Sequence, residues 1–172
     1  TADGYKTKSG AVLVPETDAL TFTLVAGDSW DGSVSAALAG AGTEDEPYRI
    51  ANAADLAYLS QALRDTIGSP YKTAYYTLEA DIDLGGITWS PIGKTSVSPF
   101  AGHFDGKGHT ISGLTVSDES DVYAYYGLFG CLSEATVKNL TVEGEVFCTE
   151  RSALVGGLAG AAVGNTTIEN CA

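Results

Sequence analysis

Three aspartates stand where carboxylates could carry chemistry. Asp81 and Asp83 are two positions apart, and Asp105 follows downstream. Alternate positions on a strand share one face, and paired carboxylates serve as acid and base in polysaccharide hydrolysis. The same aspartates adjoin glycine-containing turns, where Asp side chains commonly hydrogen-bond the turn backbone. We favour the structural interpretation, and the catalytic one stays open as the alternative.

Metal binding is the second chemistry that these residues suggest. Carboxylate oxygens bind calcium, so Asp81, Asp83 and Asp105 are the candidate metal ligands, but they match no defined calcium loop. His103 and His109 lack the spacing of a zinc site. The sequence also contains no nucleophile elbow and no phosphate-binding loop. We therefore expect no catalytic residue, no metal and no other cofactor in this chain.

Aromatic side chains offer a different kind of site, one that binds without catalysis. Tyr123, Tyr125 and Tyr126 form a cluster, and Trp89 lies upstream. Aromatic rings can stack on sugars or anchor a protein partner. Because Tyr is often only half-buried, packing at a corner of the fold is the favoured explanation for the tyrosines. We take these four residues as the candidate ligand-binding residues.

An internal repeat predicts the elements that would position these side chains. The unit Gly-Leu-x-Gly occurs at residues 127–130 and 157–160, and an alternating apolar pattern begins at Ile111, Val137 and Ile168. Steps of this length, with short strand-like runs between glycines, are typical of a β-solenoid. The spacing predicts columns of Leu114, Leu140 and Cys171, and of Leu128 and Leu158. Glycine in the repeated unit indicates positive φ or close approach of the neighbouring coil.

The remaining elements divide the chain into three segments. Residues 1–40 form an N-terminal strand-rich segment, with apolar runs at 11–14 and 20–25. Residues 41–70 hold a loop and one amphipathic helix, with Asn52 as N-cap and Leu56, Leu59, Leu63 and Ile67 on one face before Gly68. This helix would cap the first coil. Residues 71–172 form the coils, with first strands at 75–84, 87–92 and 100–104.

Composition limits the function classes. The net charge of −13 argues against nucleic-acid binding and favours a secreted or surface protein. No apolar run is long enough to span a membrane. The three cysteines have no metal-type spacing and are best explained as buried small hydrophobes. With no Met and a repeat interrupted at Ala172, the chain is expected to be processed or excised, and the natural protein to continue with further coils.

Several segments, taken in order, resemble the GLUG-motif β-helical modules of large bacterial, mostly Gram-positive, cell-surface and adhesin-like proteins. The matching segments include WDGS at 30–33, DIDL at 81–84, WSPIG at 89–93, FAGHFDGKGHTI at 100–111 and the two Gly-Leu-x-Gly units. The resemblance covers about residues 30–171. It implies a mostly β fold, namely a right-handed parallel β-helix (β-solenoid) with one N-terminal capping helix.

The resemblance also implies a role. It indicates a non-catalytic structural or adhesion module of a secreted or cell-wall-attached protein, located outside the cell at its surface. The expected partners are a host protein or a glycan, together with further β-helix coils of the parent protein; neither nucleic acid nor a membrane span is expected. The alternatives are part of a carbohydrate-active enzyme and an accessory region of an IgA1-protease-type surface metallopeptidase, because fold alone does not decide function.

Overall fold

The computed structural model describes residues 29–64, 69–117, 125–148 and 153–172. Within them the chain is mostly β with one α-helix near the start, which confirms that part of the prediction. The strands predicted at 11–14 and 20–25 lie outside the described residues, as do Ile67 and Gly68.

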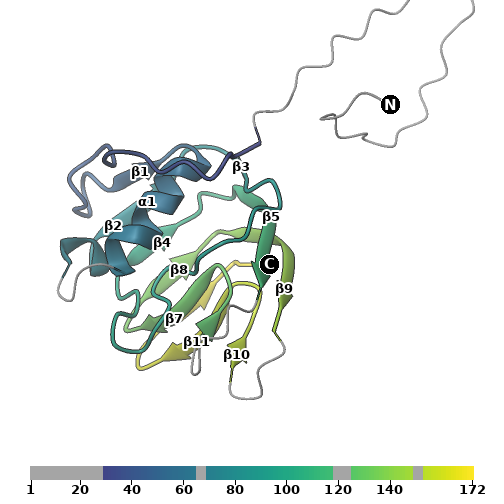
Figure 1. Ribbon diagram of the computed structural model, residues 1–172. Helices are drawn as coiled ribbons and strands as arrows, with labels where there is room; N and C mark the ends of the chain where they lie inside the picture. Colours follow the sequence, from purple (N-terminus) through teal and green to yellow (C-terminus); the bar gives the residue numbers. More distant parts are fainter. Residues whose placement is uncertain (1–28, 65–68, 118–124, 149–152) are drawn as a thin grey trace, which may run out of the picture.

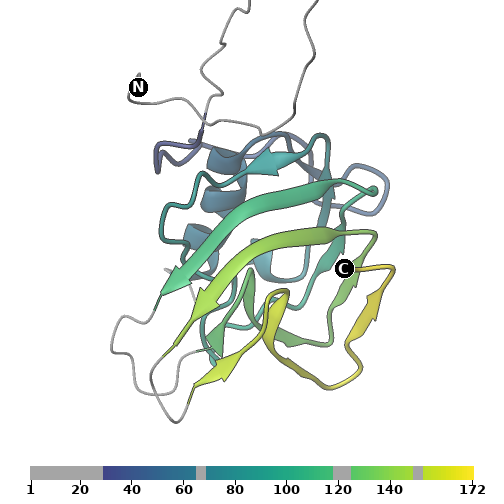
Figure 2. The same ribbon diagram turned by 90° about the vertical axis from the view of Figure 1, so that its right-hand side faces the viewer.

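The strands are short and stack on one another in parallel (Figures 1 and 2). In the described part of the chain they form four separate sheets, and every pairing between the named strands is parallel. Sheet A consists of β1 (Tyr48–Ile50), β2 (Tyr75–Leu78), β4 (His103–Asp105), β8 (Thr136–Lys138) and β12 (Thr167–Glu169). Sheet B consists of β3 (Ile82–Asp83), β5 (Thr110–Ser117) and β9 (Thr141–Phe147). Each of the two small sheets has two strands: β7 (Phe129–Ser133) pairs with β11 (Ala159–Val163), and β6 (Tyr125–Tyr126) pairs with β10 (Leu154–Val155).

The register confirms one of the two predicted repeat steps and corrects the other. Val137 pairs with Ile168, as predicted. The predicted step from Ile111 to Val137 is wrong, because Val137 pairs with Phe104 and Ile111 pairs with Val142. Leu114 accordingly lies opposite Gly144, and not in a column with Leu140.

Turn length is the reason for that error. The turn between β4 and β5 contains residues 106–109, whereas the turn between β8 and β9 contains only residues 139–140. The predicted first coil consists of shorter pieces than the predicted runs. Its run at 75–84 is divided into β2 and β3, and the runs at 87–92 and 100–104 pair through isolated bridges at Thr88, Ile92 and Phe100 before β4 begins. The short strand β1 lies between the predicted loop and the predicted helix.

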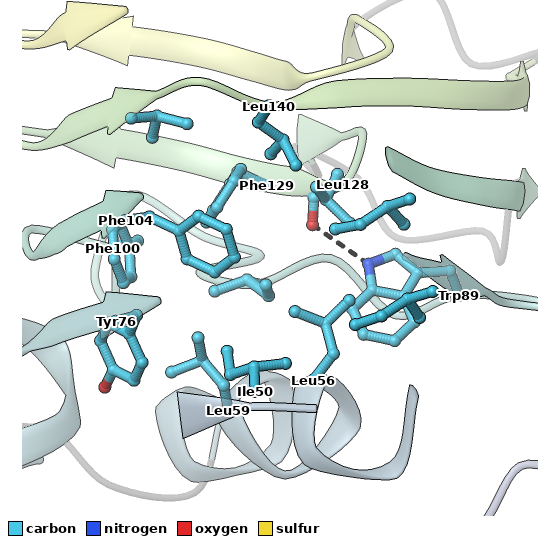
Figure 3. Close-up of a cluster of buried hydrophobic side chains, with 14 of the residues drawn as sticks. Ile50, Leu56, Leu59, Tyr76, Trp89, Phe100, Phe104, Leu128, Phe129 and Leu140 are labelled. Atoms are coloured by element: carbon cyan, nitrogen blue, oxygen red, sulfur yellow. Dashed lines mark hydrogen bonds between the residues drawn. The ribbon is translucent and has the colours of Figure 1, made fainter. Parts of the chain in front are cut away.

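The helix α1 (Ala53–Arg64) begins where the sequence predicts. Asn52 Oδ1 accepts a hydrogen bond from the backbone N–H of Asp55 at 3.0 Å, which satisfies a free donor of the first turn. Leu56, Leu59 and Leu63 are buried in the same core as the stacked strands (Figure 3). The helix thereby covers the core at the N-terminal end of the strand stack (Figure 1).

Close packing explains three of the four glycines of the repeated unit. A Cβ atom on Gly130 would lie 2.7 Å from the carbonyl oxygen of Gly93, and one on Gly160 would lie 2.7 Å from that of Leu154. Gly127 is equally crowded by the backbone of Gly156. Gly157 has open space around it, and none of the four has positive φ. Close approach of neighbouring strands, and not backbone conformation, is therefore what the unit requires.

Candidate functional site

The three predicted carboxylates do not converge on one site. Asp83 belongs to sheet B, and with Asp81 it lines a shallow cleft beside the start of α1, whereas Asp105 belongs to sheet A and lines a different groove. Each carboxylate accepts a backbone hydrogen bond at a turn: Asp81 from Thr110, Asp83 from Gly85 and Asp105 from Lys107, all at 2.8–2.9 Å. The three carboxylates therefore do not line one common groove, and their hydrogen bonds to the backbone match the structural interpretation.

The histidines follow the same pattern. His109 Nδ1 lies 3.1 Å from Asp81 Oδ1, and its ring is partly exposed at the turn. The hydrogen bond from the Thr110 N–H, and then that from His109, lower the pKa of the exposed Asp81. His103 stacks on Tyr75, with ring centroids 4.2 Å apart. Within the described residues there is no group of three or more His, Cys, Asp or Glu side chains that could hold a metal ion.

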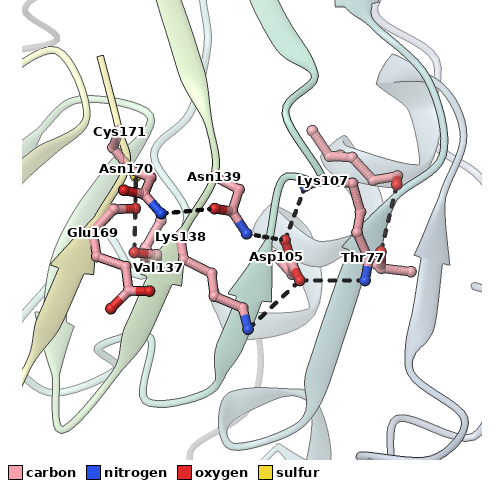
Figure 4. Close-up of polar contacts among 10 residues, drawn as sticks. Thr77, Asp105, Lys107, Val137, Lys138, Asn139, Glu169, Asn170 and Cys171 are labelled. Carbon is pink, nitrogen blue, oxygen red and sulfur yellow. Dashed lines mark hydrogen bonds and ion pairs between the residues drawn. The ribbon is translucent and has the colours of Figure 1, made fainter.

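Asp105 is the centre of a polar ladder that runs across successive strands of sheet A (Figure 4). Asn139 Nδ2 donates to Asp105 Oδ1 at 3.0 Å, and Asn170 Nδ2 donates to Asn139 Oδ1 at 3.1 Å. Lys107 Nζ and Lys138 Nζ lie 3.3 and 3.7 Å from Asp105 Oδ2. Burial raises the pKa of Asp105, but the hydrogen bonds from Asn139 and Lys107 outweigh it, so that its pKa lies below the ordinary value.

Sequence reasoning missed this ladder although a signal was present. Asn139 and Asn170 occupy the same position of the repeat, directly after β8 and β12. Both adopt positive φ, of 55° and 52°. Asn tolerates this conformation better than other residues that have a side chain. An asparagine that recurs at one position of a repeat therefore indicates both a left-handed corner and a side-chain ladder.

The predicted binding aromatics are largely inside the molecule. Trp89 is 3% exposed, and its Nε1–H donates to the carbonyl oxygen of Leu128 at 3.0 Å (Figure 3). Tyr126 is 2% exposed, and Tyr125 is half-buried in β6. Tyr123 lies outside the described residues. Trp89 and Tyr126 thus serve mainly as core.

A cleft nevertheless forms next to Trp89, and we call it the tryptophan cleft. It has a volume of about 310 Å³ and lies between α1 and the strands. Trp30 lines it and is only partly buried, with its ring edge-on to Trp89 at a centroid distance of 5.8 Å. Other lining residues include Ser60, Arg64, Thr88, Lys94 and Tyr126. Trp30 is therefore the aromatic side chain that a ligand in this cleft would meet.

A second hollow, the sheet A groove, crosses the outer face of that sheet. It has a volume of about 360 Å³ and is lined by Glu44, Tyr75, His103, Asp105 and Lys138, among others. Its aromatic pair is engaged with itself, since Tyr75 and His103 are stacked at an interplanar angle of 18°. Its charges are likewise paired at Asp105.

Part of this chain is similar in sequence to a curated protein. An alignment over 124 residues, which covers 66% of the chain, shows 36% identity to part of halomucin from Haloquadratum walsbyi. The matched stretch corresponds to only about 1% of the length of halomucin. No family model and no solved structure matches the chain. In the described residues, no helix has the length and apolar character needed to cross a membrane.

Proposed function

We propose that this chain is a non-catalytic structural and adhesion module of an extracellular, cell-surface protein, built as a right-handed parallel β-helix of the GLUG-motif type. In this architecture each strand of sheet A belongs to one rung, and α1 closes the first rung. The registers support it, because Tyr48 pairs with Tyr76 and Ile82 pairs with Ile111, so that each strand returns beside its predecessor after a similar length of chain. Repeated short steps of this size are what stacked rungs require.

The observation that carries the proposal is the continuous column inside sheet A. Tyr76, Phe104 and Val137 pair in succession and are 2%, 1% and 0% exposed. The polar ladder from Asp105 to Asn170 follows the same direction outside the column. An apolar column inside and a hydrogen-bonded ladder outside together stiffen the stack along its axis. Such a stack is suited to projecting a binding surface away from a cell.

Surface location is supported by two features of the chain. Its net charge of −13 favours solubility outside the cell and disfavours nucleic acid as a partner. The similarity to a part of halomucin fits a protein of the cell exterior. The partner proposed for the binding surface is a glycan, because the tryptophan cleft combines the partly buried ring of Trp30 with exposed polar side chains such as Thr88 and Arg64.

A glycan array of the purified chain tests the binding part of the proposal. Trp30→Ala should weaken binding about fivefold or more, because an aromatic contact and its buried area contribute on the order of 1 kcal/mol or above. Trp30→Phe keeps a ring and should retain most of the binding. Tyr125→Ala alters a half-buried ring that does not line the cleft, so it should bind like the wild type.

The controls make the outcomes distinct. Trp89→Ala is unsuitable as a binding variant, because the loss of a buried core side chain would destabilise the fold. Thermal unfolding of each variant shows that a lost signal is not a lost fold. If no glycan binds the wild type, or if Trp30→Ala binds as well as it does, the glycan proposal for this cleft is wrong.

A further inference from the structure

The last strands of the stack present an open face, which we call the end face. In all four sheets of the described residues the strand at one edge comes from the last part of the chain, namely β9, β10, β11 and β12. Ile168 continues the inner column of Phe104 and Val137 but is 44% exposed. Leu154 and Val155 are exposed by about half as well. At the opposite end, α1 keeps Ile50 and Leu56 fully buried.

The outer column of sheet A carries a charge pattern that reaches this face. Asp105 pairs in register with Lys138, and Lys138 pairs with Glu169. The sign therefore alternates from strand to strand, and Glu169 is exposed at the end of the column. Cross-strand neighbours of opposite charge stabilise a sheet, and like charges destabilise it. The position next to Glu169 is consequently suited to a cation.

The polar ladder ends at the same place. Asn170 donates to Asn139, as Asn139 donates to Asp105, and Asn170 has the same left-handed backbone conformation as Asn139. Asn139 shows which group continues the ladder, because its side-chain oxygen accepts a hydrogen bond from the side-chain amide of Asn170, one strand further on. By the same geometry, the side-chain oxygen of Asn170 is placed to accept an amide from a further strand.

We propose that the end face binds a β-strand segment of the β8 type, which adds to β12 in parallel. Such a segment brings an apolar residue opposite Ile168, a lysine or arginine opposite Glu169 and an asparagine opposite Asn170. This inference rests on the proposed stacked architecture and adds the chemistry that selects the next strand. A second copy of the chain, meeting this one end to end through β12, would bring together two chains that each carry a net charge of −13, so charge disfavours that occupant.

An extended chain tests the proposal. The segment 142–172 is repeated once after Ala172, which keeps the spacing from Thr136 to its partner Thr167. Two versions are compared: one with the appended copy unchanged, and one with Glu169→Lys in the appended copy only. The lysine version should melt roughly 2 °C or more above the unchanged version. That difference should shrink in about 1 M salt, since exposed charges are screened, and amide exchange in β12 should slow in the lysine version.

Each other outcome counts against the proposal. If neither extension raises Tm or slows exchange in β12, the end face does not bind such a segment. If both versions are stabilised equally, the charge of Glu169 does not select the strand. If the unextended chain forms a dimer that Ile168→Glu dissociates, the occupant is a second copy. The glycan array tests the tryptophan cleft and this experiment tests the end face, so the two proposals can fail separately.

Discussion

Gly130→Ala is the substitution that most directly tests the close packing of neighbouring strands. The added Cβ atom would lie 2.7 Å from the Gly93 carbonyl oxygen and 2.7 Å from the Lys94 Cα atom. Non-bonded heavy atoms of this kind normally stay about 3.5–4.0 Å apart. Both obstacles are backbone atoms, so no flexible side chain can move away. The strand that carries Gly130 must therefore shift relative to its neighbour.

That shift threatens two hydrogen bonds between the same segments. The Gly130 N–H donates to the Ile92 carbonyl oxygen, and the Cys131 N–H donates to that of Gly93, each at 2.8 Å. Overpacking costs about 1–3 kcal/mol, and one weakened hydrogen bond adds about 1 kcal/mol. Replacing Gly by Ala also stabilises the fold by about 0.4–1 kcal/mol, because it lowers the conformational entropy of the unfolded chain. We expect a net destabilisation of about 2 kcal/mol, or roughly 4–8 °C in Tm for a chain of this size.

Gly157→Ala is the control, because it makes the same change within the repeated unit at a glycine that has no atom within 4 Å of an added Cβ. Gly157 holds the position of the crowded Gly127 in the other copy of the unit. Its φ is not positive, so alanine fits the backbone. We expect its Tm to equal or slightly exceed that of the wild type. Differential scanning calorimetry measures all three proteins. An unchanged Tm for Gly130→Ala, or an equal loss for Gly157→Ala, would refute the explanation by close packing.

Three further predictions concern the helix, the polar ladder and the cysteines. Leu59→Ala, in the fully buried face of α1, should destabilise the chain by about 2–5 kcal/mol in urea unfolding, whereas the exposed Gln61→Ala should change stability little. Because the pKa of Asp105 is lowered in the folded chain, ionised Asp105 stabilises the fold fully at a pH above the ordinary Asp pKa, and this stabilisation is lost as the pH falls through the lowered pKa. Asp105→Asn should therefore flatten the decline of Tm below about pH 4. Equal declines of Tm in the variant and the wild type would contradict the lowered pKa of Asp105. Burial raises the pKa of the Cys131 thiol, so iodoacetamide should label Cys148 and Cys171, which are half-buried, before Cys131; early labelling of Cys131 in the folded chain would show that its surroundings open.

Several local features could be predicted from residue types alone. Asn52 and the spacing of Leu56, Leu59 and Leu63 predict α1, because a cap and an apolar stripe depend only on neighbouring residues. The turn contact of Asp83 follows from the glycines beside it, whereas Asp81 bonds to Thr110 of the neighbouring strand β5. The candidate site was predicted less well. The sequence predicts Trp89 and Tyr126 as binding residues, but an aromatic residue has the same sequence pattern whether it fills a core or lines a cleft.

The sequence by itself determined that this chain is mostly β, that it repeats, that one helix precedes the repeats and that glycines are needed within the repeated unit. Only the tertiary structure decided which residues stack. Val137 can be matched with Ile111 or with Phe104, seven positions earlier, because an apolar residue meets an apolar residue in either alignment. Backbone hydrogen bonds and the longer turn at residues 106–109 remove that ambiguity, and neither is visible in the pattern. Exposure is decided in the same way: Val137 and Ile168 hold equivalent positions, but only Val137 has a strand on both sides.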